Sequence, residues 1–249
     1  MADEVFRMRR FALPFLLLLA ACSEPAEESR PGPDAGRVEP YVLALSWQPA
    51  FCETAQRRPE CRSQTASRPD ATRLSLHGLW PQPGTNVYCG VAQRDADASR
   101  GGQWRDISME RLPEPLWNRL REGMPGTRSN LHRHEWIKHG TCMSGADPSF
   151  YFTVSLDLLD IVNESALGRL LAASIGRELS GTQLRAAFEQ DFGPGAGSRL
   201  RLSCTDDGVR RIIREFTIGL AGDLAARKPD RNAMAEWIAA SRPTDPGCP

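Results

Sequence analysis

Seven cysteines are spread over the 249-residue chain, and their number and positions limit what it can fold into. One of them, Cys22, directly follows an apolar run near the amino terminus, whereas the other six lie between Cys52 and Cys248. An odd number is unusual in an exported protein, but the six can pair completely, in any of several connectivities. Disulfides persist mainly in oxidising compartments, so three of them would require export from the cytoplasm.

The amino terminus has the layout of a signal peptide. Three arginines, Arg7, Arg9 and Arg10, precede an apolar run at residues 11–21. This run is too short to cross a bilayer, for which a helix needs about 20 apolar residues. A basic flank followed by a short apolar run is typical of a secretory signal peptide. We therefore expect residues 1–21 to be removed during export.

The apolar run ends in Leu19-Ala20-Ala21-Cys22, which resembles the lipobox of bacterial lipoproteins. The resemblance implies that Cys22 is acylated and that Ser23 directs the protein to the outer membrane. Residues 22–39 would then be the lipidated cysteine and a disordered tether, since they are rich in Pro, Glu, Gly and Ser. We expect a periplasmic or cell-surface protein that reaches the membrane only through this anchor. The alternative is a plain secretory peptide cut near Ala21, which would give a soluble periplasmic or secreted protein.

Residues 132–142 read His-Arg-His-Glu-Trp-Ile-Lys-His-Gly-Thr-Cys and hold three of the chain's four histidines. If the segment is helical, residues three or four positions apart lie on one face. Four reactive side chains then share a face: His134, Glu135, Lys138 and His139. Ile137 and Trp136 are left to pack inward, and Gly140 is placed to end the helix in the left-handed region. His132 lies outside this face, and we expect it to be solvated or to support the site from behind.

The fourth histidine, His77, lies in Leu76-His77-Gly78-Leu79-Trp80-Pro81. Two histidines can divide the roles of general base and general acid, because the ordinary pKa of imidazole is near 6.5. A glutamate and a lysine between them suit a reaction in which charge develops on a phosphate. The chain has no Gly-x-Ser-x-Gly nucleophile motif, so the nucleophile would come from the substrate. RNA can supply its own 2′-hydroxyl, whereas DNA cannot.

His-Gly-Leu-Trp-Pro at 77–81 and His-Glu-Trp-Ile-Lys-His-Gly-Thr-Cys at 134–142 resemble, in this order, the two active-site segments of the ribonuclease T2 family. Residues 41–52 resemble the opening strand and first cysteine of that family. The resemblance spans residues 40–249, although the last hundred residues match mainly in their cysteines and element order. It implies an endoribonuclease that needs no metal or other cofactor.

The resemblance also implies a role for each site residue. His139 would be the base that takes the proton of the 2′-hydroxyl, and His77 the acid that protonates the leaving 5′ oxygen. They would exchange roles when the resulting 2′,3′-cyclic phosphate is hydrolysed. Three residues would bind or stabilise the phosphate: His134, Glu135 and Lys138. Trp80 would stack on a base, as aromatic side chains do in the recognition of single-stranded RNA.

Lys138 is one of only two lysines in a chain with 29 arginines. A lysine at this position looks selected for its compact ammonium, which a planar guanidinium does not reproduce. The alternative is an ordinary exposed ion pair between Glu135 and Lys138 on a helix surface.

The resemblance implies three disulfides, Cys52–Cys61, Cys89–Cys142 and Cys204–Cys248. The second would tie the loop after the His77 segment to the end of the catalytic helix. It competes with a zinc site, for which four residues have suitable ligand types: His132, His134, His139 and Cys142.

Residues 40–249 are numerous enough for one catalytic domain with its own core. Short apolar runs predict strands at 42–47, 74–79 and 209–218. Helices are expected at 116–122, 136–139, 150–163, 167–178 and 182–190, and residues 82–106 read as a long loop. Strands mixed with several helices predict an α+β domain, in which helices pack against a central antiparallel sheet.

Charge gives little guidance about the partner. The chain carries 31 basic and 31 acidic residues; five and seven of these precede residue 40, which leaves 26 and 24 in the domain. This balance provides no field that would hold long duplexes. We expect a monomer that binds single-stranded RNA transiently, with low base specificity. Two other classes stay open, an RNA-binding surface lipoprotein without turnover and a metal-dependent hydrolase.

Overall fold

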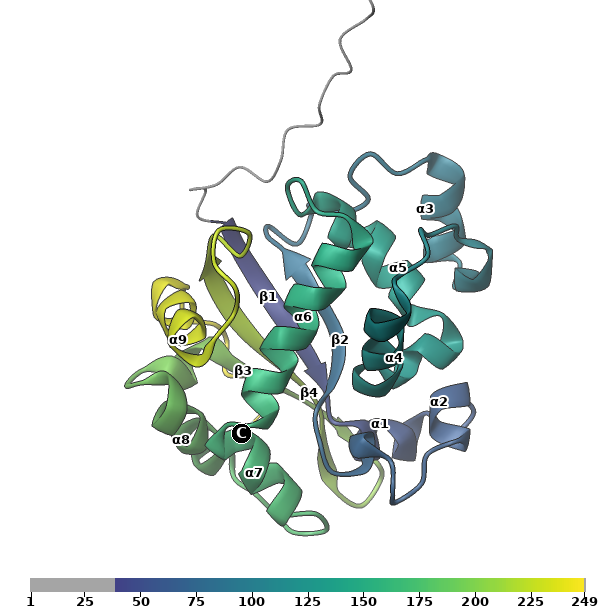
Figure 1. Ribbon diagram of the computed structural model, residues 1–249. Helices are drawn as coiled ribbons and strands as arrows, with labels where there is room; N and C mark the ends of the chain where they lie inside the picture. The colour runs from purple at the N-terminus through teal and green to yellow at the C-terminus, as the bar shows by residue number, and fades with distance from the viewer. Residues whose placement is uncertain (1–38, 249) are drawn as a thin grey trace, which may run out of the picture. The chain divides into compact units, whose positions relative to one another are not determined.

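The computed structural model describes residues 39–248, in which helices pack against a sheet of strands (Figure 1). The predictions of a signal peptide, an acylated Cys22 and a tether concern residues that lie outside this part of the chain. The domain was expected to begin at residue 40, and the first strand begins at Glu39. Within 39–248, no helix combines the length and the apolar character that crossing a membrane requires.

Within residues 39–248, four antiparallel strands form a sheet in the spatial order β2-β1-β4-β3. Their bounds are β1 Glu39–Ser46, β2 Ser75–Pro81, β3 Leu200–Asp206 and β4 Arg211–Gly222. Leu43 and Leu45 of β1 lie opposite Ile218 and Phe216 of β4, and all four side chains are fully buried on one face. Because successive strand residues point to opposite faces, Ser46 and its neighbours across the sheet lie on the other face, where the site is built.

Helices surround this sheet within the described residues. Their bounds are α1 Gln48–Thr54, α2 Pro59–Arg62, α3 Gln93–Arg100, α4 Glu114–Gly123, α5 Leu131–Lys138, α6 Pro148–Asn163, α7 Ala166–Ala173, α8 Gly181–Phe192 and α9 Arg231–Ala240. The longest, α6, lies across the sheet (Figure 1), and its Tyr151 and Phe152 join Leu43 and Leu45 in one apolar cluster. The side chain of Asp147 caps α6 by accepting the backbone N–H of Phe150, which defines where this helix starts.

The structure confirms the α+β prediction and most of the expected elements. The strands expected at 42–47, 74–79 and 209–218 correspond to β1, β2 and β4, and all five expected helices are present. Three boundaries differ by four residues or more. Strand β4 ends at Gly222, four residues later than expected. Helix α5 begins at Leu131, five residues earlier than expected, and α7 ends at Ala173 instead of continuing to residue 178.

The expectation that 82–106 is one long loop is wrong, because this segment contains α3 and a 3₁₀ turn at Trp104–Asp106. Helix α3 buries only Ala96 and Ser99, so it has no apolar stripe that a sequence pattern would reveal. Strand β3 was also missed, since Leu200 and Leu202 are its only buried residues. It is held instead by pairing along β4.

A β-bulge in β2 turns His77 away from the apolar core. In the pairing with β1, Ala44 lies opposite Gly78, whereas Leu45 lies opposite Leu76, so His77 is an extra residue without a partner. Leu76 therefore points into the core, where it is 2% exposed. The adjacent His77 stays outside the apolar core. A bulge is a common way to re-aim a side chain next to an active site.

The three expected disulfides are all present: Cys52–Cys61, Cys89–Cys142 and Cys204–Cys248. The second links the segment before α3 to the 3₁₀ turn Gly140–Cys142 that follows α5. This bridge excludes Cys142 as a thiolate ligand of the zinc site considered from the sequence, because a disulfide sulfur is not available as a thiolate.

Gly140 does not end α5 in the left-handed region, so that prediction is wrong; the residue lies in a 3₁₀ turn and is not among the glycines with positive φ. Its small size has another reason. A Cβ atom at this position would lie 2.3 Å from Cε3 of Trp136 and 3.1 Å from Cγ of Tyr151. The two rings contact each other at 5.9 Å between centroids, and they close over the glycine.

Replacing Gly140 with alanine should therefore destabilise the fold. We expect Gly140→Ala to lower the free energy of unfolding by about 1–3 kcal/mol, the usual range for overpacking a buried site. Gly84→Ala is the matched control, because the nearest atom to its Cβ would be 3.8 Å away. Urea unfolding of both variants checks this, and equal stabilities would contradict it.

Candidate active site

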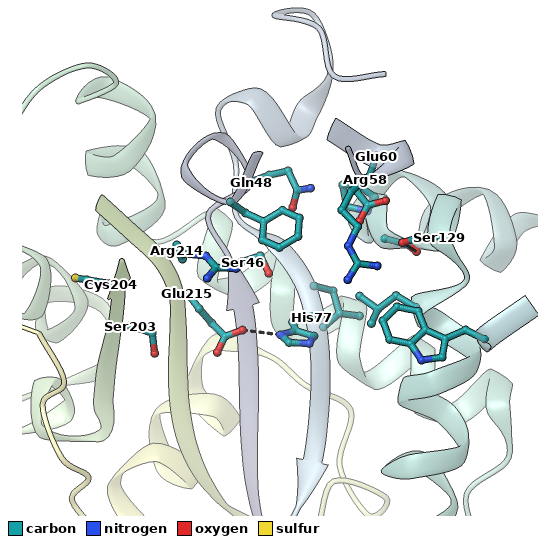
Figure 2. A pocket seen from close by; sticks show the side chains of 16 residues that line it. Ser46, Gln48, Arg58, Glu60, His77, Ser129, Ser203, Cys204, Arg214 and Glu215 are labelled. Carbon is teal, nitrogen blue, oxygen red and sulfur yellow. Dashed lines mark hydrogen bonds and ion pairs between the residues drawn. The ribbon is translucent and has the colours of Figure 1, made fainter. Parts of the chain in front are cut away.

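His77 of β2 is held by a carboxylate from another strand. Its Nδ1 lies 2.5 Å from Oε2 of Glu215 on β4, and Figure 2 shows the two side chains facing each other. Its other nitrogen, Nε2, lies 3.6 Å from Oε1 of Glu135. About one third of the His77 side chain is exposed. The imidazole is thus fixed through Nδ1 and open to the solvent side of the sheet.

Glu135 of α5 lies at the centre of the site and is 1% exposed. Its Oε2 accepts a hydrogen bond from Nε1 of Trp80 at 2.8 Å, and its Oε1 lies 3.9 Å from Nε2 of His134. The helix approaches β2 this closely because residue 78 is glycine. A Cβ at Gly78 would lie 2.1 Å from Oε2 of Glu135.

Trp80 lies between the two histidines that were expected to act as acid and base. Its ring centroid is 5.3 Å from that of His77, edge to face, and 5.4 Å from that of His139. The side chain is partly buried, with its N–H directed at Glu135. Trp80 therefore sets the spacing of the imidazoles through its contacts with the protein, and base stacking by this residue stays a prediction.

The structure brings together the residues of the 132–142 segment that were expected to share a face, with one difference. His134, Glu135 and Lys138 belong to α5, whereas His139 follows the helix with φ −120° and ψ −48°. His139 is 7% exposed, and its Nδ1 has no hydrogen-bond partner among the described residues. The carbonyl of Lys138 accepts the backbone N–H of Tyr88, next to the Cys89–Cys142 bridge.

The segment 82–106 supplies support for His134 that the sequence did not reveal. Oγ of Ser99 lies 2.6 Å from Nδ1 of His134, and the indole of Trp104 stacks on the imidazole at 4.8 Å. Tyr88 extends this series of hydrogen bonds, because its hydroxyl lies 3.2 Å from Oγ of Ser99. Trp104 was the one available signal, since a tryptophan in so polar a segment is unexpected.

His132 is buried, at 4% exposure, so it is not the solvated residue that was one of the two expectations for it. Its ring lies 5.1 Å from that of Trp117 on α4, and its Nδ1 has no partner among residues 39–248. It therefore packs behind the site between α5 and α4. Within the same range, no three His, Cys, Asp or Glu side chains are grouped so that they could hold a metal ion.

The environment moves the pKa values of the two central histidines in opposite directions. Burial lowers the pKa of His77, but its hydrogen bond to Glu215 and the charges of Glu135 and Glu215 outweigh this, so the net shift is upward. Burial, together with the charge of Lys138, lowers the pKa of His139 to about 3. The pKa of Glu135 is raised, mainly by burial. At neutral pH this favours a protonated His77 beside a neutral His139.

A cavity of about 350 Å³ opens beside His77 (Figure 2). Its apolar walls include Phe51, Leu76, Trp104 and Leu131. Its polar groups include Arg58, which lies over the Trp104 ring, and Arg214, which lies over the Phe51 ring. Oε2 of Glu60 and Nε of Arg214 are buried and have no hydrogen-bond partner among the described residues. The cavity thus offers flat apolar surfaces and free polar atoms.

The buried histidine His132 should make the fold sensitive to acid. Burial holds its pKa at about 4 in the folded protein, whereas the unfolded chain has the ordinary value near 6.5. Below pH 6.5 the unfolded state therefore binds a proton that the folded state does not bind, and stability falls as the pH falls toward 4.

We expect this one group to reduce the free energy of unfolding by roughly 2 kcal/mol at pH 5 relative to pH 7.5. His132→Gln should show a correspondingly shallower decline, because the other titrating groups are common to both proteins. Urea unfolding at the two pH values measures the difference, and parallel declines would contradict the assignment.

Comparison with known proteins identifies the family of this chain. Residues 38–225 match the sequence model of the Ribonuclease T2 family. Ribonuclease I of Escherichia coli (strain K12) is 34% identical over 215 residues, which cover 76% of this chain and 77% of that protein. Ribonuclease Rh of Rhizopus niveus is 25% identical over 214 residues, covering 80% and 79% of the two chains.

Solved structures share the fold. The S3-RNase of Japanese pear superposes with a TM-score of 0.51 at 18% identity, covering 85% of this chain and 96% of that one. A mutant of RNase MC1 in complex with 5′-UMP gives a TM-score of 0.50 at 20% identity, with coverages of 77% and 91%. The extent of the family match and the identity to the bacterial enzyme are decisive: the chain belongs to the ribonuclease T2 family and is an endoribonuclease of that type.

Proposed function

We propose that the protein cleaves single-stranded RNA without a metal ion, by transphosphorylation through a 2′,3′-cyclic phosphate. His139 takes the proton of the 2′-hydroxyl, whose oxygen bonds to phosphorus. His77 gives a proton to the 5′ oxygen as its bond to phosphorus breaks. In the second step, His77 takes a proton from water, the water oxygen bonds to phosphorus, and His139 protonates the departing 2′ oxygen. The product then ends in a 3′-phosphate.

The observation that carries this proposal is the placement of two imidazoles against the Trp80 ring, with centroids 5.3 and 5.4 Å from it, in environments that shift their pKa values in opposite directions. Paired groups whose environments separate their pKa values are suited to be acid and base in one reaction. His77, with its raised pKa, is the group that starts protonated, and His139, with a pKa of about 3, is the group that starts neutral. This asymmetry supports the direction of proton flow and not merely the presence of two histidines.

Glu135, Lys138 and His134 complete the proposed site. Glu135 is buried, so it acts chiefly by holding Trp80 and by facing Nε2 of both His77 and His134. Lys138 supplies the fixed positive charge for the phosphorane, in which negative charge exceeds that of the ground state. His134 binds a phosphate oxygen, oriented by Ser99 and Trp104.

The cavity beside His77 supports the binding of RNA on the leaving-group side. Its aromatic walls suit a base, and the arginines over Phe51 and Trp104 suit the phosphates of a single strand. RNase MC1, which shares the fold, has been solved with a bound nucleotide, 5′-UMP. We infer low base specificity and action as a monomer, with base stacking on Trp80.

We also propose that the enzyme works outside the cytoplasm. Three disulfides need an oxidising compartment, and one tomato relative bears the name extracellular ribonuclease LE. An acyl group on Cys22 would anchor the domain to the outer membrane, and a soluble periplasmic or secreted form is the alternative. Mass spectrometry of the amino-terminal peptide from membrane fractions distinguishes the two, because only the anchored form carries lipid.

Removal of either histidine should abolish most of the activity. We expect His77→Ala and His139→Ala each to reduce kcat/KM on RNA by at least about a hundredfold, the usual scale for a lost acid or base. The pH dependence of kcat/KM in the intact enzyme should show an alkaline limb above pH 6.5, where His77 loses its proton, and an acid limb near the pKa of His139. Near-normal activity of both variants would rule out the mechanism.

The two lysines of the chain allow a matched test of the positive charge that we propose acts on the phosphate. We expect Lys138→Ala to lower kcat by roughly tenfold or more with a smaller effect on KM, because its charge acts mainly in the transition state. Lys228→Ala is the control, since Lys228 lies in the segment between β4 and α9. Lys138→Arg should restore only part of the rate. Steady-state kinetics with a dinucleotide decide the matter, and equal values for both alanine variants would refute the role.

A further inference from the structure

Glu215 is a charged residue in a place where strands are normally apolar. It lies in β4, next to the fully buried Phe216, and β4 is an inner strand of the sheet. Acidic residues are depleted from strands. Glu215 pairs with Ser46 of β1 on one side and with Ser203 of β3 on the other. Its side chain is 23% exposed, which is low for a carboxylate.

The hydrogen bond of Glu215 spans the intervening strand. His77 is on β2 and Glu215 on β4, with β1 between them, so the contact between the two side chains crosses β1 (Figure 2). Neighbouring strands are about 4.8 Å apart, so the backbones of β2 and β4 are separated by about twice that distance. Ser46, which lies opposite Glu215, is small and leaves room for a contact that crosses β1.

Two separate bulges bring the partners together. His77 is the extra residue of the bulge between β1 and β2. Between β3 and β4, Ser203 lies opposite Glu215 and Cys204 opposite Ile213, which makes Arg214 the extra residue of a second bulge. The acid and the imidazole thus each lie at or beside a local distortion of an otherwise regular sheet. Bulges at active sites commonly serve to aim side chains.

We propose that Glu215 is a positioning residue for His77. The carboxylate of Glu215 accepts the Nδ1–H of His77, which leaves Nε2 as the nitrogen that gives and later takes the proton. The inference rests on the proposed function, in which His77 is the acid of the first step. In that step the proton moves from Nε2 to the 5′ oxygen as the P–O5′ bond breaks, and Nδ1–H stays bound to Glu215. The neutral ring then presents a lone pair on Nε2, ready to accept a proton from water in the second step.

Other charged groups also face His77 and have to be considered. Those acting on it from β4 and α5 are Glu215, Glu135 and Lys138, and the imidazoles of His134 and His139 respond to its charge. Arg58 and Arg214 line the cavity on its open side. Burial and Lys138 lower the pKa of His77, whereas Glu215 contributes both a hydrogen bond and a charge that raise it. Without the Glu215 charge, His77 should lose its proton at lower pH.

The test compares Glu215→Gln with Glu236→Gln in the whole protein. Glutamine at 215 keeps an oxygen for the Nδ1–H bond but removes the charge, while Glu236 is an exposed residue of α9 paired with Arg227. We expect Glu215→Gln to move the alkaline limb of the kcat/KM profile to lower pH and to reduce kcat at pH 7 by about tenfold. Glu236→Gln should match the wild type. A profile for Glu215→Gln that superimposes on the wild type would overturn the proposal.

The leaving group offers a readout that a purely structural role would not change. The 4-nitrophenyl ester of uridine 3′-phosphate releases a weakly basic phenolate that needs no acid. The loss of rate in Glu215→Gln and in His77→Ala should therefore shrink to less than about threefold on this ester, while His139→Ala stays defective. If Glu215→Gln lost the same factor of rate on RNA and on the 4-nitrophenyl ester, Glu215 would serve only the stability of the fold.

Nitrogen-15 NMR of the wild type keeps the proposal testable even if the variant fails to fold. The chain has only four histidines, so the imidazole signals can be assigned by single replacements. Above its pKa, His77 should carry its proton on Nδ1, and a proton on Nε2 would overturn the proposal.

Failure of the proposed function and failure of the positioning role give different results. Full activity of His77→Ala would remove the proposed function itself. An inactive His77→Ala beside a normal Glu215→Gln would remove only the positioning role.

Discussion

The rest of the site depends on the hydrogen bond between the buried carboxylate of Glu135 and the indole of Trp80. Burying a charge is unfavourable unless partners compensate it, and here the indole N–H of Trp80 and the nearby imidazoles provide that compensation. The same contact fixes α5 against β2, because Gly78 leaves the space that the carboxylate fills. The hydrogen bond from Trp80 to Glu135 therefore joins α5 to the sheet. It also holds the carboxylate next to His77 and His134.

The outer parts of the domain hold this junction in place from both sides. The Cys89–Cys142 bridge and the bond from Tyr88 to the Lys138 carbonyl tie the segment before α3 to the end of α5. Ser99 and Trp104 then fix the ring of His134. On the sheet side, Glu215 reaches across β1 to His77. The imidazoles of His134 and His77 are thus oriented by different elements of the domain.

The predictable and the unpredictable parts of this site differ in how the chain brings residues together. Glu135 and Lys138 lie within one turn of α5 and His139 directly follows the helix, so their proximity follows from their nearness in the sequence. The family resemblance supplied the pairing of cysteines. Glu215 is 138 residues from His77, and only the order β2-β1-β4 places them together. The bulge at His77 also escaped prediction, because a bulge is a property of a strand pair and leaves no mark in one strand. Helix α3 escaped because its buried face consists of Ala96 and Ser99.

The most direct test of the account uses an RNA oligonucleotide that contains one 2′-deoxynucleotide, incubated with the oxidised domain in EDTA. Mass spectrometry of the fragments locates each cut and identifies its ends. The proposed mechanism predicts cleavage at the ordinary linkages, with 2′,3′-cyclic phosphate or 3′-phosphate ends, and no cut after the 2′-deoxynucleotide. A cut at that linkage, or fragments with 5′-phosphate ends, would contradict a mechanism in which the substrate's own hydroxyl is the nucleophile.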